Sequence, residues 1–341
     1  MPNAMIVSPT ITDAGLVANR YASQQAFADY RLRKSANTLR AHKADLATFA
    51  DYICASGVTG CPTGDELQSR PEAWLGVTWG YVQAFVNWML GQGLAVTSVN
   101  RKLSTVKVYA KLAAKADTID KHELTMINAV TGFSAKEFNR VNEKRSALGT
   151  KTRQSTKKVI NVSITVEQAK QLKEQPNTPQ GRRDALIMCL LLDHGLRVGE
   201  LAKMQVTNID LAKGEIVFYR DKVQKSQRHA MTPDTFQALR AWAKSGDMPS
   251  TGYLLRQSNK AGVLGRAGIT ERSLGVRVRE LGERIRIKGL GPHDCRHYWA
   301  TRAISKGTDP FALLQAGGWT SMQTVQKYVD ESKIANEGVK L

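Results

Sequence analysis

The stretch GPHDCRHYWATRAISKGTDPFALLQAGGWTSMQTVQKYV, residues 291–329, carries the side chains that decide how this chain is interpreted. His293 and Arg296 stand three residues apart, directly after a proline, which is common in the first turn of a helix. A helix that begins there presents both side chains on one face, at the end where backbone N–H groups favour an anion. Tyr328 follows much later, in a second segment that we predict to be helical.

A second arginine stands in HGLRVGEL, residues 194–201, where Arg197 and Glu200 repeat the three-residue spacing after a glycine turn. We expect Glu200 to hold the guanidinium group of Arg197. The strongly apolar segment ALIMCLLL precedes this turn, so Arg197 is predicted to emerge from the core rather than from a solvated face. Two arginines on separate helices, Arg197 and Arg296, then form a clamp for one phosphate, with bidentate geometry available to each.

A phosphate clamp without a nucleophile only binds, and Tyr328 is the candidate nucleophile, on a helix that Thr320 or Ser321 is able to cap. A phenol has a pKa of about 10 and needs help to attack. The two arginines supply positive potential, and His293 is able to move the proton. Each residue taken alone also has an ordinary interpretation: a surface His and Arg, an intrahelical ion pair or a core tyrosine.

The charge of the chain indicates a polyanionic partner. The 341 residues contain 49 Lys and Arg against 30 Asp and Glu, a formal net charge of +19. A basic protein that merely stays soluble is the plain alternative. An anionic membrane is less favoured, because no basic amphipathic helix stands out. No apolar run reaches the length of a membrane span and the N-terminus lacks the layout of a signal peptide, so we predict a cytosolic protein.

The four cysteines predict neither a disulfide nor a metal site. They form no CxxC pair and stand near no set of histidines with metal-ligand spacing. Reduced thiols agree with a cytosolic protein. Cys295 is expected to be a small buried spacer; the other three are Cys54, Cys61 and Cys189.

Periodicity and composition divide the chain into four predicted parts. Leu46, Phe49 and Ile53 share one face of a helix that Ser35 or Asn37 is able to cap, and further helical patterns follow. The predicted parts are a flexible tail at 1–20, a helical domain at 21–140, a basic linker at 141–160 and a second domain at 161–341.

Basic residues of the first domain and of the linker are the candidates for DNA contact, because cations along a backbone track the phosphates. They are Arg101, Lys102, Lys107, Lys151, Arg153, Lys157 and Lys158.

The second domain is predicted to be mainly α-helical with one small sheet. EIVFYR (215–220) and RHAMT (228–232) alternate like short strands around the loop DKVQKSQ (221–227). The remainder, from Pro233 onward, is predicted to be helical with loops.

Taken together, these motifs resemble those of the tyrosine recombinases, or phage-type integrases, which share their catalytic fold with type IB topoisomerases. HGLRVGEL is similar to the first arginine motif of that family, and HDCRH to its HxxR box. GGWTSMQTVQKYV is similar to the box that joins the His/Trp position to the nucleophile, with Tyr328 nine residues after Trp319. The helices at 35–49 and 97–112 are similar to those of the family's core-binding domain.

The resemblance implies the fold. It is mainly α in two domains, a helical core-binding (SAM-like) domain and a mixed α/β catalytic domain with a small antiparallel sheet.

The resemblance also implies a role for each matching residue. Arg197 and Arg296 hold the non-bridging oxygens of the scissile phosphate, and Glu200 supports Arg197. Trp319 stands where many members have a second histidine, and it is able to pack or to donate one N–H but not to move a proton. The remaining implied roles are proton transfer for His293, nucleophile for Tyr328, and general acid to the leaving 5′-oxygen for Lys222, with Lys225 as the alternative.

The activity implied is site-specific cleavage and rejoining of DNA through a 3′-phosphotyrosyl intermediate, in integration, excision or resolution, with no metal or other cofactor. The implied partners are double-stranded DNA with inverted-repeat core sites and a homotetramer on two such sites, in the cytoplasm and associated with the nucleoid. The alternatives are resealing of the same strand, as in type IB topoisomerases, and an inactive DNA-binding protein on a recombinase scaffold. The tail 332–341, with Ile334, Val339 and Leu341, is expected to pack on a neighbouring protomer.

Overall fold

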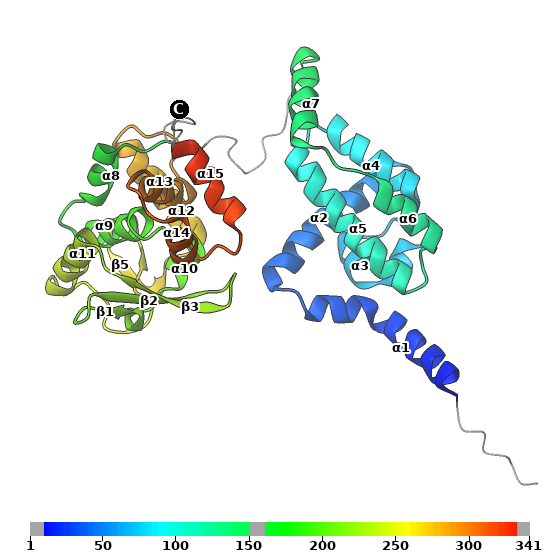
Figure 1. Cartoon of the computed structure of the whole chain (residues 1–341), viewed down its shortest axis with the longest axis horizontal. Helices are drawn as coiled ribbons and strands as arrows, with labels where there is room; N and C mark the ends of the chain where they lie inside the picture. Colours follow the sequence, from blue (N-terminus) through cyan, green and yellow to red (C-terminus); the bar gives the residue numbers. More distant parts are fainter. Residues whose placement is uncertain (1–9, 150–160, 333–341) are drawn as a thin grey trace, which may run out of the picture. The chain divides into compact units, whose positions relative to one another are not determined.

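The structure is a computed structural model that describes residues 10–149 and 161–332 (Figure 1). The chain divides into two compact units, Met1–Lys158 and Val159–Leu341, which are described one at a time. Within the described ranges, no helix combines the length and the apolar character needed to cross a membrane.

The first unit is entirely helical in its described part. Ser35 caps α2, and Leu46, Phe49 and Ile53 of that helix are buried as predicted. They pack with Phe85 and Tyr109 in one apolar core. The elements are α1 (Ile11–Leu32), α2 (Ala36–Ala55), α3 (Gly64–Ser69), the 3₁₀ turn η1 (Pro71–Trp74), α4 (Trp79–Gly91), α5 (Val96–Lys115), α6 (Lys121–Ala129) and α7 (Ala135–Ala147).

The predicted boundaries of this unit need two corrections. Residues 11–20, expected in the tail, belong to α1, because Thr10 and Asp13 form a capping box that satisfies its first N–H groups although the turn is exposed. Residues 141–147, expected in the linker, belong to α7. Arg145 of α7 is buried and donates hydrogen bonds to the carbonyls of Leu90 (2.6 Å) and Leu94 (2.9 Å). A cation there adds charged donors to carbonyls at and just beyond the C-terminal end of α4, where the helix dipole favours positive charge.

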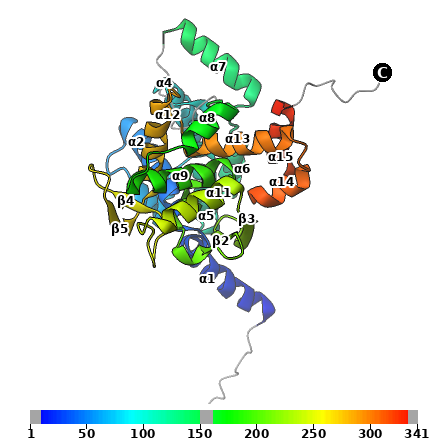
Figure 2. The ribbon, with the colours of Figure 1, turned by 90° about the vertical axis from the view of Figure 1, so that its left-hand side faces the viewer.

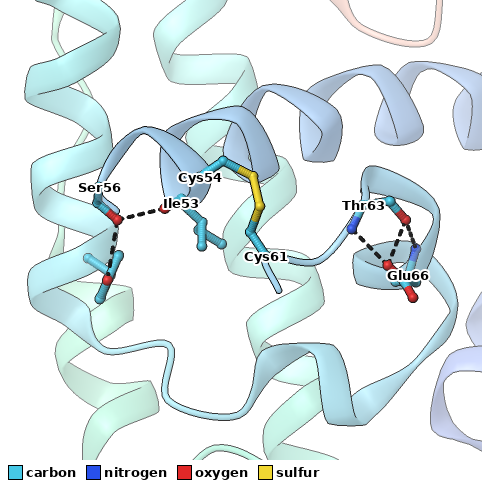
Figure 3. Close-up of a disulfide and its surroundings, with 7 residues drawn as sticks. Ile53, Cys54, Ser56, Cys61, Thr63 and Glu66 are labelled. Carbon is cyan, nitrogen blue, oxygen red and sulfur yellow. Dashed lines mark hydrogen bonds between the residues drawn. A yellow bond between two sulfur atoms is a disulfide. The ribbon is translucent and has the colours of Figure 1, made fainter. Parts of the chain in front are cut away.

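The prediction of four free thiols was wrong for one pair. Cys54, in the last turn of α2, forms a disulfide with Cys61 in the loop before α3 (Figure 3). The two Cα atoms are 5.5 Å apart although seven positions separate them in the sequence. Gly57 and Gly60 both have positive φ, which lets the chain reverse between the cysteines without a recognisable motif. Cys189 and Cys295 are buried.

Reduction of this disulfide should destabilise the helical unit. Closing a loop this short stabilises a fold by about 2 kcal/mol through the lost entropy of the unfolded chain. We expect dithiothreitol to lower the urea midpoint of the wild-type protein and to leave that of Cys54→Ser unchanged. Equal midpoints of the wild-type protein with and without reductant would contradict the prediction.

The second unit contains helices and two small sheets. Its helices are α8 (Val166–Lys173), α9 (Pro179–Leu192), α10 (Val198–Lys203), η2 (Val206–Asn208), α11 (Pro233–Lys244), α12 (Glu271–Arg284), α13 (Pro292–Ser305), α14 (Pro310–Gly317) and α15 (Met322–Ser332). The first sheet has the antiparallel order β1-β2-β3, and β4 and β5 form the second. The strands are β1 (Ile209–Asp210), β2 (Glu215–Arg220), β3 (Lys225–Ala230), β4 (Arg256–Ser258) and β5 (Leu264–Gly268).

The sheets differ from the prediction in two respects. The pair β4–β5 was expected to be loop, because its strands are short and carry little apolar alternation. The turn of the β2–β3 hairpin is also shorter than expected. Arg220 pairs with Lys225 across the strands, so the turn contains only residues 221–224.

The interior of this unit positions the C-terminal helices. Residues 186–192 of α9 are all buried, and α13 packs against α9. Helices α14 and α15 pack against α13 and against each other, and Figure 2 shows the three side by side. As predicted, α13 begins at Pro292. Gly195, with φ of 59°, breaks the chain between α9 and α10, and a β-carbon there would lie 2.2 Å from the indole of Trp299.

Candidate active site

Arg197 stands at the N-terminal boundary of α10, where Glu200 binds both its side chain and its backbone. Its guanidinium donates to Glu200 Oε1 at 2.9 Å, and its backbone N–H donates to Oε2 at 2.8 Å. The side chain of Arg197 remains 25% exposed, which leaves part of the guanidinium accessible to a ligand. Glu200 is buried and also receives bonds from a second arginine, described below.

Arg296 comes from the second turn of α13 and is 4% exposed. Its guanidinium donates to the carbonyls of Gly195 and Gly317, the latter at 2.5 Å. Its central carbon lies 4.5 Å from the ring centroid of Trp319. In the part of the chain that the structure describes, no salt bridge neutralises Arg296, so its charge rests on carbonyl dipoles and an indole face.

A third arginine, Arg220, was missed in the sequence. It is 1% exposed, and one guanidinium nitrogen donates to both carboxylate oxygens of Glu200 at 2.9 Å. A signal for it exists, because Ile216, Phe218 and Arg220 occupy the buried positions of the alternating strand β2. An arginine at an inward-facing position of a strand requires a buried hydrogen-bond acceptor.

The electrostatic balance of these side chains favours an anion. Three arginines, Arg197, Arg220 and Arg296, surround the single carboxylate Glu200. Burial lowers the pKa of Arg296 to about 9, and the charges of Arg197 and Arg220 act in the same direction. Burial also lowers the pKa of Arg220. The guanidinium of Arg296 is still charged at neutral pH, and an oxyanion placed beside it would supply the missing negative charge.

The turn after α14 holds these arginines in place. Carbonyls at the C-terminal end of a helix lack intrahelical donors and carry partial negative charge. Here four consecutive carbonyls accept bonds from side chains: Gln315 from Gln227, Ala316 from Arg220 (2.7 Å), Gly317 from Arg296 (2.5 Å) and Gly318 from Arg197 (2.9 Å). Side chains from α10, α13, β2 and β3 therefore meet on one turn.

Tyr328 lies on α15, ten residues beyond this turn, and is 7% exposed. Its ring centroid is 5.4 Å from that of Trp319 and 5.1 Å from that of His297. Its charged form would interact with Arg296, since Tyr328 contributes to raising the pKa of that arginine. At the start of the helix, the Ser321 hydroxyl accepts a bond from the backbone of Gln323 at 3.3 Å. The structure thus brings a phenol, an indole and the arginine cluster together.

The model of the phage integrase family matches residues 163–334, just over half of the chain. The chain belongs to the phage integrase family. It is therefore a site-specific tyrosine recombinase, an enzyme that acts on DNA. The family match covers the whole arginine cluster and Tyr328.

Curated relatives extend the similarity over both units. The tyrosine recombinase XerC of Herpetosiphon aurantiacus is 23% identical over 301 residues, covering 87% of this chain and 85% of that protein. The XerC protein of Bifidobacterium longum subsp. infantis is 25% identical over 327 residues, covering 87% and 89%.

Solved structures share the fold. The Tn1549 transposon integrase in complex with transposon right end DNA has a TM-score of 0.61 at 16% identity, over 90% of this chain and 94% of that one. A lambda integrase dimer bound to a COC′ core site has a TM-score of 0.56 at 14% identity, over 98% and 84%. The predicted fold, mainly α with a small antiparallel sheet, is confirmed.

Three of the predicted site residues of this recombinase are exposed. His293 is exposed, one turn before Arg296 on α13. Lys222 lies in the β2–β3 turn and Lys225 begins β3, and both are exposed. Among the described residues, no side-chain hydrogen bond or ion pair joins either lysine to the arginines.

The predicted DNA contacts of the recombinase are partly engaged within the protein. Asp45 is 1% exposed and binds Arg101 at 2.6 Å and Lys102 at 3.3 Å, because a buried carboxylate requires cations. Arg101 is still 54% exposed, whereas Lys102 is 11% exposed. Lys107 donates to the carbonyl of Asn128 at 2.9 Å. The linker candidates Lys151, Arg153, Lys157 and Lys158 lie outside the described residues.

No group of His, Cys, Asp and Glu side chains able to hold a metal ion occurs within residues 10–149 and 161–332.

A histidine pair, of which His194 is buried and His229 half-buried, makes the stability of the catalytic unit depend on pH. His194 is 3% exposed, its Nε2 lies 3.0 Å from Thr235 Oγ1, and its ring stacks 5.7 Å from that of His229. Burial lowers the pKa of His194 to about 3 and that of His229 to about 4. The unfolded chain then binds protons more strongly than the folded chain below pH about 6.5.

Above pH about 6.5 we expect these two histidines to leave the free energy of unfolding independent of pH. As the pH falls below that value, the free energy of unfolding should decrease, by up to about 1.4 kcal/mol per pH unit for His194. Urea unfolding between pH 7 and about 5 measures the slope. His194→Asn should flatten it, and His122→Asn, at an exposed position, should not. An identical slope in His194→Asn and the wild-type protein would contradict the assignment.

Proposed function

We propose that this recombinase cleaves DNA with Tyr328 as the nucleophile and that Arg197 and Arg296 hold the scissile phosphate. The observation that carries the proposal is the turn at residues 316–318, which binds both arginines and leads directly into the helix of Tyr328. Because the clamp and the phenol are tied to one short segment, a phosphate bound by the arginines would lie near Tyr328 Oη. Such placement of reacting groups is a large part of catalysis.

In the proposed reaction, one phosphoester bond forms for each one that breaks. Tyr328 Oη loses its proton, with assistance from His293, and attacks phosphorus. The bond from phosphorus to the 5′-oxygen breaks as the 3′-phosphotyrosyl ester forms, and the leaving oxygen takes a proton from a hairpin lysine. A 5′-hydroxyl of the partner strand then attacks the ester and releases the tyrosine. The phosphodiester energy is retained in the ester, so neither a nucleotide nor a metal has to supply it.

Glu200 and Trp319 support the clamp in this scheme. Glu200 binds the guanidinium and the backbone of Arg197, which fixes the direction of its remaining N–H groups. Trp319 contacts both Arg296 and Tyr328. The centroid of its ring lies 4.5 Å from the guanidinium carbon of Arg296 and 5.4 Å from the ring centroid of Tyr328. It acts by packing, since an indole does not exchange a proton.

The wider assignments follow the same proposal. The helical unit, which runs from α1 to α7 (residues 11–147), serves as the core-binding domain, the segment from there to residue 160 as linker and residues 161–341 as the catalytic domain. The partner is double-stranded DNA with inverted-repeat core sites, bound by a homotetramer on two sites in the cytoplasm. The tail 332–341, whose residues from 333 lie outside the described structure, is proposed to pack on a neighbouring protomer.

A nicked suicide substrate tests the function. Cleavage releases a short oligonucleotide that carries the 5′-hydroxyl, so the covalent adduct accumulates and its attachment site is found by peptide mass spectrometry. Attachment at Tyr328 and strand exchange with a second duplex are expected. DNA binding without any adduct would support an inactive scaffold, and relaxation of supercoiled DNA without strand exchange would support a topoisomerase.

A substrate with sulfur in place of the leaving 5′-oxygen shows which hairpin lysine, Lys222 or Lys225, is the general acid. Sulfur leaves without a proton, so a general acid becomes dispensable. We expect Lys222→Ala to slow cleavage of the oxygen substrate by about 100-fold and to be nearly neutral on the sulfur substrate. If Lys225→Ala shows this rescue and Lys222→Ala does not, the general acid is Lys225.

A further inference from the structure

Arg220 is built into the active site although it cannot reach DNA. It is 1% exposed, and each of its three guanidinium nitrogens is engaged within the protein. One donates to both oxygens of Glu200, one to the carbonyl of Ala316 and one to the side-chain oxygen of Gln227. A residue with this environment does not contact a phosphate, so any part it has in the reaction is exerted through its neighbours.

Those neighbours belong to separate segments of the chain. Glu200 lies in α10, where it also holds Arg197. Ala316 belongs to the last turn of α14, next to the carbonyls that hold Arg296 and Arg197. Arg220 itself ends β2, and Gln227, on β3, both accepts from Arg220 and donates to the carbonyl of Gln315.

Steric contact reinforces these bonds. Gly318 has φ of 57°, and a β-carbon at this position would lie 2.4 Å from Cδ of Arg220. The aliphatic part of Arg220 therefore packs directly on the backbone of the turn that precedes α15. The guanidinium carbon also lies 4.8 Å from the ring centroid of Phe218. The arginine is therefore confined by packing as well as by hydrogen bonds.

The position of Arg220 in the hairpin gives this confinement a consequence. Arg220 is the last residue of β2 and pairs with Lys225, the first residue of β3. Lys222 is two residues further along, in the turn. The turn itself has few attachments; Lys203 forms an ion pair with Asp221, but both side chains are largely exposed. Arg220 is thus the buried anchor at the base of the segment that carries both candidate general acids.

We propose that Arg220 is a positioning residue that couples the β2–β3 hairpin to the turn at residues 315–318. Through this coupling it fixes the position of the hairpin lysine relative to the phosphate clamp and Tyr328. The inference rests on the proposed function for its catalytic consequence. Its structural part, the coupling of the two segments, does not depend on that function. The two parts therefore call for separate measurements.

Amide hydrogen exchange tests the coupling without any reaction. In Arg220→Met we expect exchange to become about tenfold faster both in residues 221–228 and in residues 315–319, because each segment loses a partly buried, charge-assisted hydrogen bond. Arg228→Met is the matched control, since Arg228 lies on the same hairpin with its side chain 68% exposed. Faster exchange in only one of the two segments would overturn the coupling, whether or not the protein cleaves DNA.

Single-turnover cleavage tests the catalytic part. Arg220→Met should bind DNA as the wild-type protein does and slow cleavage of the oxygen substrate by about 10- to 100-fold, with a smaller loss in Arg220→Lys. On the substrate with a sulfur leaving group the loss should shrink to about threefold, because a misplaced general acid no longer matters. An equal loss on both substrates would show that Arg220 does not act through the hairpin lysine.

Gln227→Ala covers the case in which Arg220→Met does not fold. Gln227 is half-buried, and its loss removes one bond to Arg220 and one to Gln315 while leaving the bonds between Arg220 and Glu200 in place. The same two segments should exchange faster, by a smaller factor, and the same reduction of the defect on sulfur should appear. Absence of both effects in a folded Gln227→Ala protein would count against the proposal. If the wild-type protein forms no adduct at all, the proposed function fails and the exchange data alone decide the coupling.

Discussion

Replacement of Tyr328 by phenylalanine should abolish the covalent adduct with DNA. The substitution removes the only atom that is proposed to attack phosphorus, and the residual rate should lie below detection on a suicide substrate. The ring stays between Trp319 and His297, so the fold is retained, with a change in unfolding free energy of no more than about 1.5 kcal/mol. Binding of a single DNA site should be unchanged, because Tyr328 is buried and the substitution removes none of the basic side chains that track phosphates.

Tyr298→Phe is the matched control for that experiment. Tyr298 lies on α13, is 9% exposed and accepts a hydrogen bond from Arg302 at 2.8 Å, so its removal also deletes one nearly buried hydroxyl. The control should retain the adduct. An adduct in Tyr328→Phe that maps to another tyrosine would refute the assignment of the nucleophile.

Replacement of Arg296 by alanine should slow cleavage by about 100- to 1,000-fold, which is the usual loss when one positioned donor to a developing charge is removed. The arginine is the most buried cation of the proposed clamp and lies against the indole that also contacts Tyr328. Its loss therefore removes a donor to the phosphate and the packing partner of Trp319 together. Single-turnover rates at saturating protein measure the effect without a contribution from binding.

Arg302→Ala serves as its control, because Arg302 is a half-buried arginine on the same helix that bonds to and packs on Tyr298. It should cleave within about threefold of the wild-type rate, in line with surface substitutions away from a site. Arg296→Lys keeps the charge but loses the fork that spans the carbonyls of Gly195 and Gly317. A wild-type rate in Arg296→Ala would place the clamp elsewhere.

Local signals in the sequence predicted much of the fold. Pro292 and the apolar spacing of α2 marked helices that the structure contains, because capping and periodicity act within a few residues. Features that depend on contacts between distant segments were not predicted. The disulfide Cys54–Cys61 depends on a reversal between two glycines, and the pair β4–β5 lacks the apolar alternation that marks a strand.

The candidate site shows the same division. Arg197, Glu200, Arg296, Trp319 and Tyr328 were each recognised from a short motif, and the structure places them around one turn. Arg220 was not recognised, because nothing adjacent to it in the sequence indicates that Glu200 and Ala316 will surround it. Their roles in the reaction remain predictions, to be decided by the variants described above.

The glycine pair before Trp319 restricts how this protein could be altered. A β-carbon at Gly317 would lie 2.2 Å from the Trp319 ring, and one at Gly318 would meet Arg220 in a backbone conformation that side chains rarely adopt. In a saturation library, residues 317 and 318 should therefore tolerate almost no replacement, whichever DNA sequence is used for selection. Libraries would gain more variety from exposed positions such as Ser104 of α5, which takes part neither in the arginine cluster nor in the ion pairs of Asp45.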